Sequence, residues 1–157
     1  MWKGIDVSDN QGAINWAQIP KNVDFAILRS VRRSGKADHQ FAANLEGCRK
    51  RNIPMSVYKY TYAATPEAAR QEAQQVVALL QSYGLTGTMV WWDVEDKDVL
   101  RPLGAAKLTE CIRAAQEVIT AAGYSFGLYV GLYVYNEHWF DFNAFSGTRL
   151  WVARYYK

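Results

Sequence analysis

The chain has 157 residues, half of them hydrophobic, and its 18 basic and 15 acidic residues give a formal net charge of +3. A chain of this length buries roughly 70% of its unfolded surface as one domain, so we expect a single domain over residues 1–157. The low net charge and the many aromatic residues exclude a disordered chain. The basic residues form no stripe on any predicted element, which argues against a nucleic-acid partner.

The first residues, Met1 to Asp6, contain no apolar run and no small-residue cleavage site, so we expect no signal peptide. No segment reaches membrane-spanning length, and we expect no membrane insertion. The mild basicity favours an anionic surface such as a bacterial cell wall. Cys48 and Cys111 fall in predicted helices and outside any CxxC pattern, which predicts buried free thiols.

Short β-branched or aromatic runs alternate with helical segments, which is the pattern of a parallel sheet built from βα units. Pro66 after Thr65 marks a helix start, and Gly84 follows the end of that helix. In chain order, the predicted elements are the strand Gly4–Val7, a short helix Asn15–Ile19, the strand Asp24–Ser30, the helix His39–Arg51, the strand Met55–Tyr62, the helix Pro66–Tyr83, the strand Thr88–Glu95, the helix Ala105–Ala122, the strand Phe126–Val130, the helix Tyr133–Phe140 and the strand Arg149–Tyr155.

Six strands in βα order favour an α/β barrel over an open doubly wound sheet, because no GxGxxG or GxxxxGK[ST] motif follows the first strand. A (β/α) barrel typically has at least about 200 residues, whereas this chain stops at Lys157, directly after a predicted strand. We therefore expect a barrel that is incomplete at its C-terminus, with an open edge that offers a route to self-association.

The strongest signal for chemistry is the pair Asp93 and Glu95. Residues two apart on a strand point to the same face, and active sites of such barrels lie at the carboxyl ends of the strands. Crowded carboxyl groups raise at least one pKa, which gives the protonated acid beside an ionised partner that glycosidic cleavage needs. The structural alternative is that both side chains are solvated where the strand ends.

Asp6 ends the first predicted strand, so a barrel would direct it to the same mouth as Asp93 and Glu95. Its alternative role is an N-cap or turn residue before Ser8. Three acids from two strands favour a catalytic site over three independent structural roles.

Aromatic side chains gather at the same strand ends, and their apolar faces and polar tips suit sugar rings. Two of the aromatic residues, Tyr58 and Trp91, fit a packed barrel interior better. The candidates for lining a carbohydrate cleft are Tyr60, Tyr62, Tyr129 and Trp151.

Other chemistries find little support in the sequence. His39 and His138 are isolated, and no HExxH motif or Cys/His cluster is present, so we expect neither a metal nor a cofactor. The absence of a GxSxG motif and of a Cys/His pairing argues against a serine or cysteine nucleophile.

An ordered set of motifs resembles the family-25 glycoside hydrolases, the Chalaropsis-type lysozymes. The resemblance implies a flattened (β/α) TIM-like barrel that hydrolyses the β-1,4 bond between N-acetylmuramic acid and N-acetylglucosamine in peptidoglycan glycan strands. The matching motifs span nearly the whole chain: GIDVS at 4–8 with Gln11-Gly12 and Ile14-Asn15-Trp16, FAILR at 25–29, Asp38 to Phe41 with Asn44, VYKY at 57–60, WDVE at 92–95 and LWVARY at 150–155.

The resemblance also implies roles for single residues. Glu95 corresponds to the general acid/base, Asp93 to its electrostatic partner and Asp6 to a further active-site carboxylate. It leaves open whether a carboxylate or the substrate's acetamido group is the nucleophile. The four candidate cleft aromatics correspond to positions that line the family's groove.

Family members continue past the LWVARY segment into further strands. The missing strands leave open a non-catalytic glycan-binding barrel as one alternative. A second alternative is a barrel glycosidase that acts on chitin-like polymers, because such enzymes share acidic strand-end motifs. An enzyme without a signal peptide would be made in the cytoplasm and reach the bacterial wall by another route or after lysis.

Overall fold

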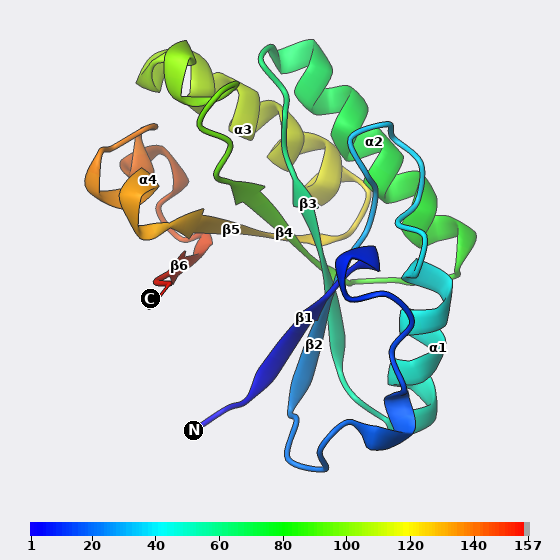
Figure 1. Cartoon of the computed structure of the whole chain (residues 1–157). Helices are drawn as coiled ribbons and strands as arrows, with labels where there is room; N and C mark the ends of the chain where they lie inside the picture. Colours follow the sequence, from blue (N-terminus) through cyan, green and yellow to red (C-terminus); the bar gives the residue numbers. More distant parts are fainter. Residues whose placement is uncertain (156–157) are drawn as a thin grey trace.

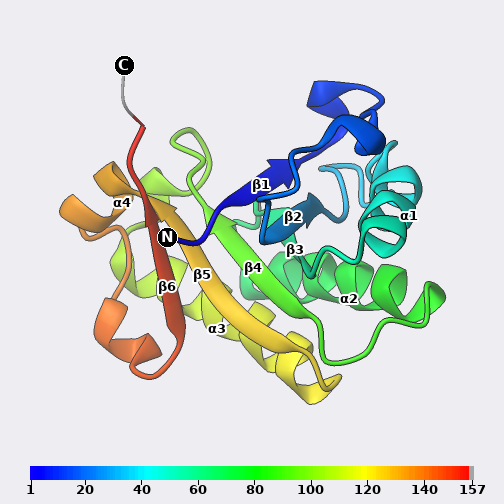
Figure 2. The ribbon, with the colours of Figure 1, turned by 90° about the horizontal axis from the view of Figure 1, so that it is seen from below.

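The computed structural model describes residues 1–155, which contain one six-stranded parallel sheet with helices on its outer side (Figure 1). Each strand is hydrogen-bonded to the next in chain order, and β1 and β6 form the two edges. The sheet curls into a half-barrel (Figure 2), which confirms the predicted incomplete α/β barrel. The strands are β1 (Gly4–Val7), β2 (Phe25–Arg29), β3 (Met55–Tyr60), β4 (Met89–Val94), β5 (Ser125–Gly131) and β6 (Arg149–Ala153).

The helical segments fall close to their predicted places. The segment predicted as a helix over Asn15–Ile19 is only a 3-10 turn, and the helix predicted over Tyr133–Phe140 stops early, because His138 takes a left-handed φ of 51° that a helix does not allow. The helices are α1 (Phe41–Arg51), α2 (Pro66–Ser82), α3 (Ala105–Ala121) and α4 (Leu132–Asn136), with 3-10 segments η1 (Asp9–Gln11), η2 (Trp16–Gln18), η3 (Arg101–Leu103) and η4 (Phe142–Phe145).

Helix α2 shows how local sequence determines an element. The Thr65 hydroxyl accepts a hydrogen bond from the backbone N–H of Ala68 at 3.1 Å, and Pro66 occupies the first turn. Gly84 adopts a φ of 66°, which lets the chain leave the helix. The buried side chains recur every three or four residues and pack on the sheet: Ala69, Ala73, Val76 and Leu80.

The two faces of the sheet differ in character. The outer face is covered by α1, α2 and α3 and carries buried apolar side chains, each contributing about 1.5–3 kcal/mol relative to an exposed position. The alternate residues point to the concave inner face, because successive side chains of a strand point to opposite sides. The outer set comprises Ala26, Leu28, Val57, Val90, Trp92, Val94, Leu128 and Val130.

Four strands, β2, β3, β4 and β6, end earlier than predicted. As a result, Tyr62, Glu95 and Tyr155 lie in the segments that follow β3, β4 and β6. At the end of β3, the backbone N–H of Thr61 still donates to the carbonyl of Asp93 at 3.1 Å. The next N–H, that of Tyr62, donates to a side chain of α2 instead of to a strand. None of the helices among residues 1–155 is long and apolar enough to cross a membrane.

Candidate active site

The carboxyl ends of the strands surround an open cleft of about 390 Å³ on the concave face. Acidic and aromatic side chains from both halves of the chain meet there, as parallel strands with helical crossovers allow. All seven predicted site residues line it: Asp6, Tyr60, Tyr62, Asp93, Glu95, Tyr129 and Trp151.

The strand register accounts for the centre of the cleft. Asp93 of β4 is paired with Tyr60 of β3 and with Tyr129 of β5. Tyr129 is in turn paired with Trp151 of β6. Because paired residues of parallel strands point to the same side, these four side chains form one row across four strands. The buried carboxyl group of Asp93 thus lies between two tyrosines.

Asp93 is only 7% exposed, and its Oδ1 atom has no hydrogen-bond partner among the described residues. Burial, together with the negative charges of Glu95 and Asp6, raises the pKa of Asp93 to about 9. At neutral pH the pair of Asp93 and Glu95 therefore retains a proton. The alternative in which Asp93 is a solvated residue at a strand end is wrong.

Glu95 is half-buried just beyond β4 and is surrounded by tyrosines. The hydroxyl of Tyr155 donates to Glu95 Oε1 at 3.3 Å, and that of Tyr133 donates to the Glu95 carbonyl oxygen at 2.8 Å. Burial raises the pKa of Glu95, while the hydrogen bond from Tyr155 acts in the opposite direction. A carboxyl group with a raised pKa suits proton donation near neutral pH.

Asp6 is exposed at the end of the edge strand β1 and lines the cleft. Its charge contributes to the raised pKa of Asp93, so the two carboxyl groups lie within electrostatic range. The cap of η1 is Ser8, whose hydroxyl accepts from the N–H of Asn10 at 3.2 Å. The alternative role of Asp6 as an N-cap is therefore wrong.

Trp151 lies at the centre of the aromatic part of the cleft. Its ring is 5.4 Å from that of Tyr129 and 5.7 Å from that of Trp91, both edge to face. Phe25 of β2 contacts it from the other side of the half-barrel, with ring centroids 6.2 Å apart. The curl of the sheet thus brings β2 and β6 together across the interior.

Tyr58 and Trp91 were expected in a packed interior, but both are half-buried and line the cleft. The concave side of a half-barrel is only partly filled, so large rings there keep one exposed edge. Sequence alone could not distinguish this case from a closed barrel, because the same alternation of residues produces both.

Tyr62 is positioned from the outer side of the sheet. Its backbone N–H donates to Glu72 Oε1 of α2 at 3.0 Å, and the other oxygen of Glu72 lies 3.9 Å from the ammonium nitrogen of Lys59. Lys59 is only 1% exposed on the otherwise apolar outer face. Lys59, a single lysine within a strand, was the one signal in the sequence that an acidic partner such as Glu72 would lie beneath the sheet.

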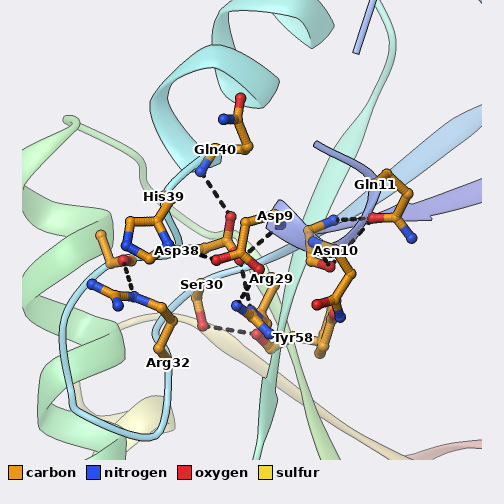
Figure 3. Close-up of polar contacts among 12 residues, drawn as sticks. Asp9, Asn10, Gln11, Arg29, Ser30, Arg32, Asp38, His39, Gln40 and Tyr58 are labelled. Carbon is orange, nitrogen blue, oxygen red and sulfur yellow. Dashed lines mark hydrogen bonds and ion pairs between the residues drawn. The ribbon is translucent and has the colours of Figure 1, made fainter. Parts of the chain in front are cut away.

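An arginine that sequence reasoning missed organises one wall of the cleft (Figure 3). The guanidinium of Arg29 donates to Asp38 Oδ2 through Nε and contacts Asp9 Oδ1 through Nη2, each at 2.6 Å. Asp9 also contacts Nδ1 of His39 at 2.7 Å. These bonds, which we call the Arg29 clasp, join β2 to the segments after β1 and before α1.

Other cleft-lining residues that sequence reasoning missed are Asn10, Arg32, Arg33 and Tyr155. Within residues 1–155, no group of three or more His, Cys, Asp or Glu side chains is arranged to hold a metal ion. Cys48 and Cys111 are free and buried, as expected from the sequence.

Comparisons with known proteins agree with this geometry. In solved structures, the chain is similar to the modular autolysin LytC from Streptococcus pneumoniae, with a TM-score of 0.76 and 28% identity over 86% of this chain and 33% of that one. It therefore spans about a third of the length of LytC. No curated protein sequence matches the chain.

Two further solved structures share the fold. The catalytic domain of the endolysin ply40 from bacteriophage P40 of Listeria monocytogenes has a TM-score of 0.77 and 24% identity, over 99% of this chain and 75% of that one. The bacterial lysozyme from Streptomyces coelicolor has a TM-score of 0.79 and 19% identity, over 99% of this chain and 75% of that one. A family model described as glycosyl hydrolases family 25 matches residues 5–157. The chain belongs to glycosyl hydrolases family 25.

Proposed function

We propose that this chain hydrolyses the β-1,4 bond between N-acetylmuramic acid and N-acetylglucosamine in the peptidoglycan of bacterial walls, acting outside the cell. The observation that carries the proposal is the pair of acids in an aromatic-lined cleft, the buried Asp93 and the half-buried Glu95, both with raised pKa values. Membership of family 25 supports it, as does the likeness to LytC, which has been solved in complex with a synthetic peptidoglycan ligand.

In the proposed mechanism, Glu95 protonates the glycosidic oxygen as the bond to the sugar breaks. Because the charge of Glu95 raises the pKa of Asp93, the pair retains a proton at neutral pH. When that proton resides on Glu95, Asp93 is ionised and stabilises the positive charge that develops on the sugar ring. Glu95, once deprotonated, then accepts a proton from the attacking water.

The remaining side chains position the glycan. Tyr60, Tyr62, Tyr129 and Trp151 offer ring faces to the C–H faces of sugars, and hydroxyl or N–H groups to their polar edges. Asp6, exposed at the cleft opening, is the further carboxylate that accepts hydrogen bonds from the sugar or its amide group.

Substitution of Glu95 by Gln tests the proposal. The variant should release reducing ends from purified peptidoglycan about 10²–10⁴ times more slowly than the parent chain, because the general acid is removed. Asp98→Asn is the matched control, since Asp98 is exposed on the same loop and lies outside the cleft, and it should keep the parent rate.

An undiminished rate in Glu95→Gln would show that the acid is assigned wrongly. If the parent chain binds glycan strands but releases no reducing ends from them, the non-catalytic glycan-binding alternative is correct.

A further inference from the structure

The cleft carries two kinds of charge. Asp6, Asp93 and Glu95 supply acids, and three arginines, Arg29, Arg32 and Arg33, also line it. The charge of Arg29 is balanced by two carboxylates, Asp9 and Asp38, in the Arg29 clasp. Neither Arg32 nor Arg33 forms an ion pair with any residue in the part of the chain that the structure describes.

A row of rings joins these arginines to the acids. Asp93 is paired in register with Tyr60, whose ring centroid lies 5.0 Å from that of Tyr62. The guanidinium carbon of Arg33 lies 4.2 Å from the centroid of the Tyr62 ring. Arg33 therefore lies at one end of a row of aromatic rings, each about the size of a sugar ring, and the buried Asp93 lies at the other end.

The loop that carries the two arginines has a defined conformation. Val31 and Ala37 form an antiparallel bridge, and the backbone N–H of Arg32 donates to the carbonyl of Lys36 at 2.8 Å. The side chain of Arg32 donates through Nε to the Ala37 carbonyl at 2.9 Å (Figure 3). Gly35, with a φ of 84°, allows the tight turn between them.

The half-buried acid Glu72 of α2 does not neutralise this cationic end. Glu72 lies within electrostatic range of Arg33, but its Oε1 already accepts from the N–H of Tyr62, and its other oxygen faces Lys59. Arg33 is exposed and Arg32 half-buried, so both guanidinium groups can reach a bound ligand. A planar guanidinium pairs most strongly with a carboxylate, which it can hold through two parallel hydrogen bonds.

We propose that Arg32 and Arg33 form a carboxylate subsite, which binds the acid group carried on the lactyl arm of N-acetylmuramic acid. That group is the lactyl carboxylate itself in peptide-free strands, and a carboxylate of the stem peptide where a peptide is attached. The subsite makes the cleft selective for muramic-acid-containing strands over neutral strands of N-acetylglucosamine. This inference rests on the proposed function, since it assigns the substrate class of the same cleft.

Binding measurements on the Glu95→Gln chain test the subsite without turnover. Isothermal titration would use three soluble ligands: a peptide-free oligosaccharide of alternating N-acetylglucosamine and N-acetylmuramic acid, the same oligosaccharide with stem peptides, and a neutral N-acetylglucosamine oligomer of equal length. Adding Arg33→Gln should weaken binding of a carboxylate-bearing ligand about three- to five-fold, the upper part of the range for an exposed ion pair. Binding of the neutral oligomer should not change.

Lys36→Gln is the matched control, because it removes the same charge from the same loop and Lys36 does not line the cleft. It should leave all three affinities unchanged. A loss seen already with the peptide-free ligand identifies the lactyl carboxylate, whereas a loss confined to the peptide-bearing ligand identifies the stem peptide. Added salt should reduce the difference between parent and Arg33→Gln, because it screens exposed charges.

Three results would overturn the subsite: equal losses for the neutral and the anionic ligands, no loss for either anionic ligand, or no binding of any of the three. An equal loss in Lys36→Gln would likewise show a general charge effect instead of a site. A chain that binds the anionic ligands through Arg33 but releases no reducing ends from peptidoglycan would contradict only the proposed hydrolase activity.

Discussion

Asp93 occupies surroundings that disfavour its ionised form. Its carboxyl group is buried, one oxygen has no hydrogen-bond partner among the described residues, and two further carboxyl groups act on it. Its pKa in the folded chain lies above the value of 3.8 for a free aspartate. The folded chain therefore binds this proton more tightly than the unfolded chain does. The contribution of Asp93 to the free energy of unfolding is greatest below pH 3.8, the pKa in the unfolded chain, and falls as the pH rises toward about 9.

Asp93→Asn should consequently raise the free energy of unfolding at neutral pH, on the order of 2 kcal/mol, because the amide cannot ionise. The gain should vanish at acidic pH, where the aspartate is protonated in both states. Urea unfolding at neutral and acidic pH measures this gain in the free energy of unfolding. A reducing-end assay of the same variant should show lost activity. A loss of stability at neutral pH would contradict the assignment, since a structural aspartate behaves in that way.

Tyr155→Phe probes the proton affinity of Glu95. The Tyr155 hydroxyl donates to the Glu95 carboxylate and lowers its pKa, so its removal should raise that pKa. The alkaline limb of the pH profile of kcat/KM should then move to higher pH, by less than about one unit. Tyr133→Phe is the control, because Tyr133 donates to the backbone carbonyl of Glu95 and should leave the limb in place. A shift to lower pH in Tyr155→Phe would refute the role of Glu95 as the acid.

At the scale of elements, the Arg29 clasp joins β2 through side chains to the segments after β1 and before α1 (Figure 3). The side chain of Asp38 is fully buried, and it accepts from Arg29, from the N–H of Asp9 and from the N–H of Gln40. Its charge is thus compensated by one cation and two backbone donors. The clasp fixes the wall of the cleft that Arg29 lines.

Asp38→Asn should lower the free energy of unfolding by about 3 kcal/mol, since it leaves a largely buried guanidinium with one partner. Glu46→Gln removes an exposed pair with Lys50 at 3.4 Å on α1 and should change stability by no more than about 0.5 kcal/mol. Chemical denaturation of both variants gives the comparison. If the two losses were equal, the clasp would be an ordinary surface interaction.

Element positions were predictable from the sequence, because apolar periodicity reports which side chains are buried. The ends of elements were less predictable. Strand β3 ends because the N–H of Tyr62 binds Glu72 of α2 instead of a neighbouring strand, and Glu72 lies ten residues further along the chain. The grouping of the acids followed from period-two spacing and the common direction of parallel strands. Arg29 and Glu72 were not predictable as parts of the site, because their roles depend on partners that only the folded chain brings together.

At the scale of the whole molecule, the cleft is a product of the curled sheet. The seven predicted site residues come from β1, from β3 to β6 and from the segments that follow β3 and β4. The contact of Phe25 with Trp151 joins the two sides of the half-barrel. Among the described residues, β1 and β6 each have an edge without a neighbouring strand. Self-association through such an edge stays a prediction.

We propose that this cleft hydrolyses the bond on the reducing side of N-acetylmuramic acid. Digestion of purified peptidoglycan, borohydride reduction of the new ends and mass spectrometry of the products would test it most directly. We expect reduced N-acetylmuramic acid at the new ends, with none formed by Glu95→Gln. Reduced N-acetylglucosamine at those ends, or products from chitin oligomers but none from peptidoglycan, would contradict it.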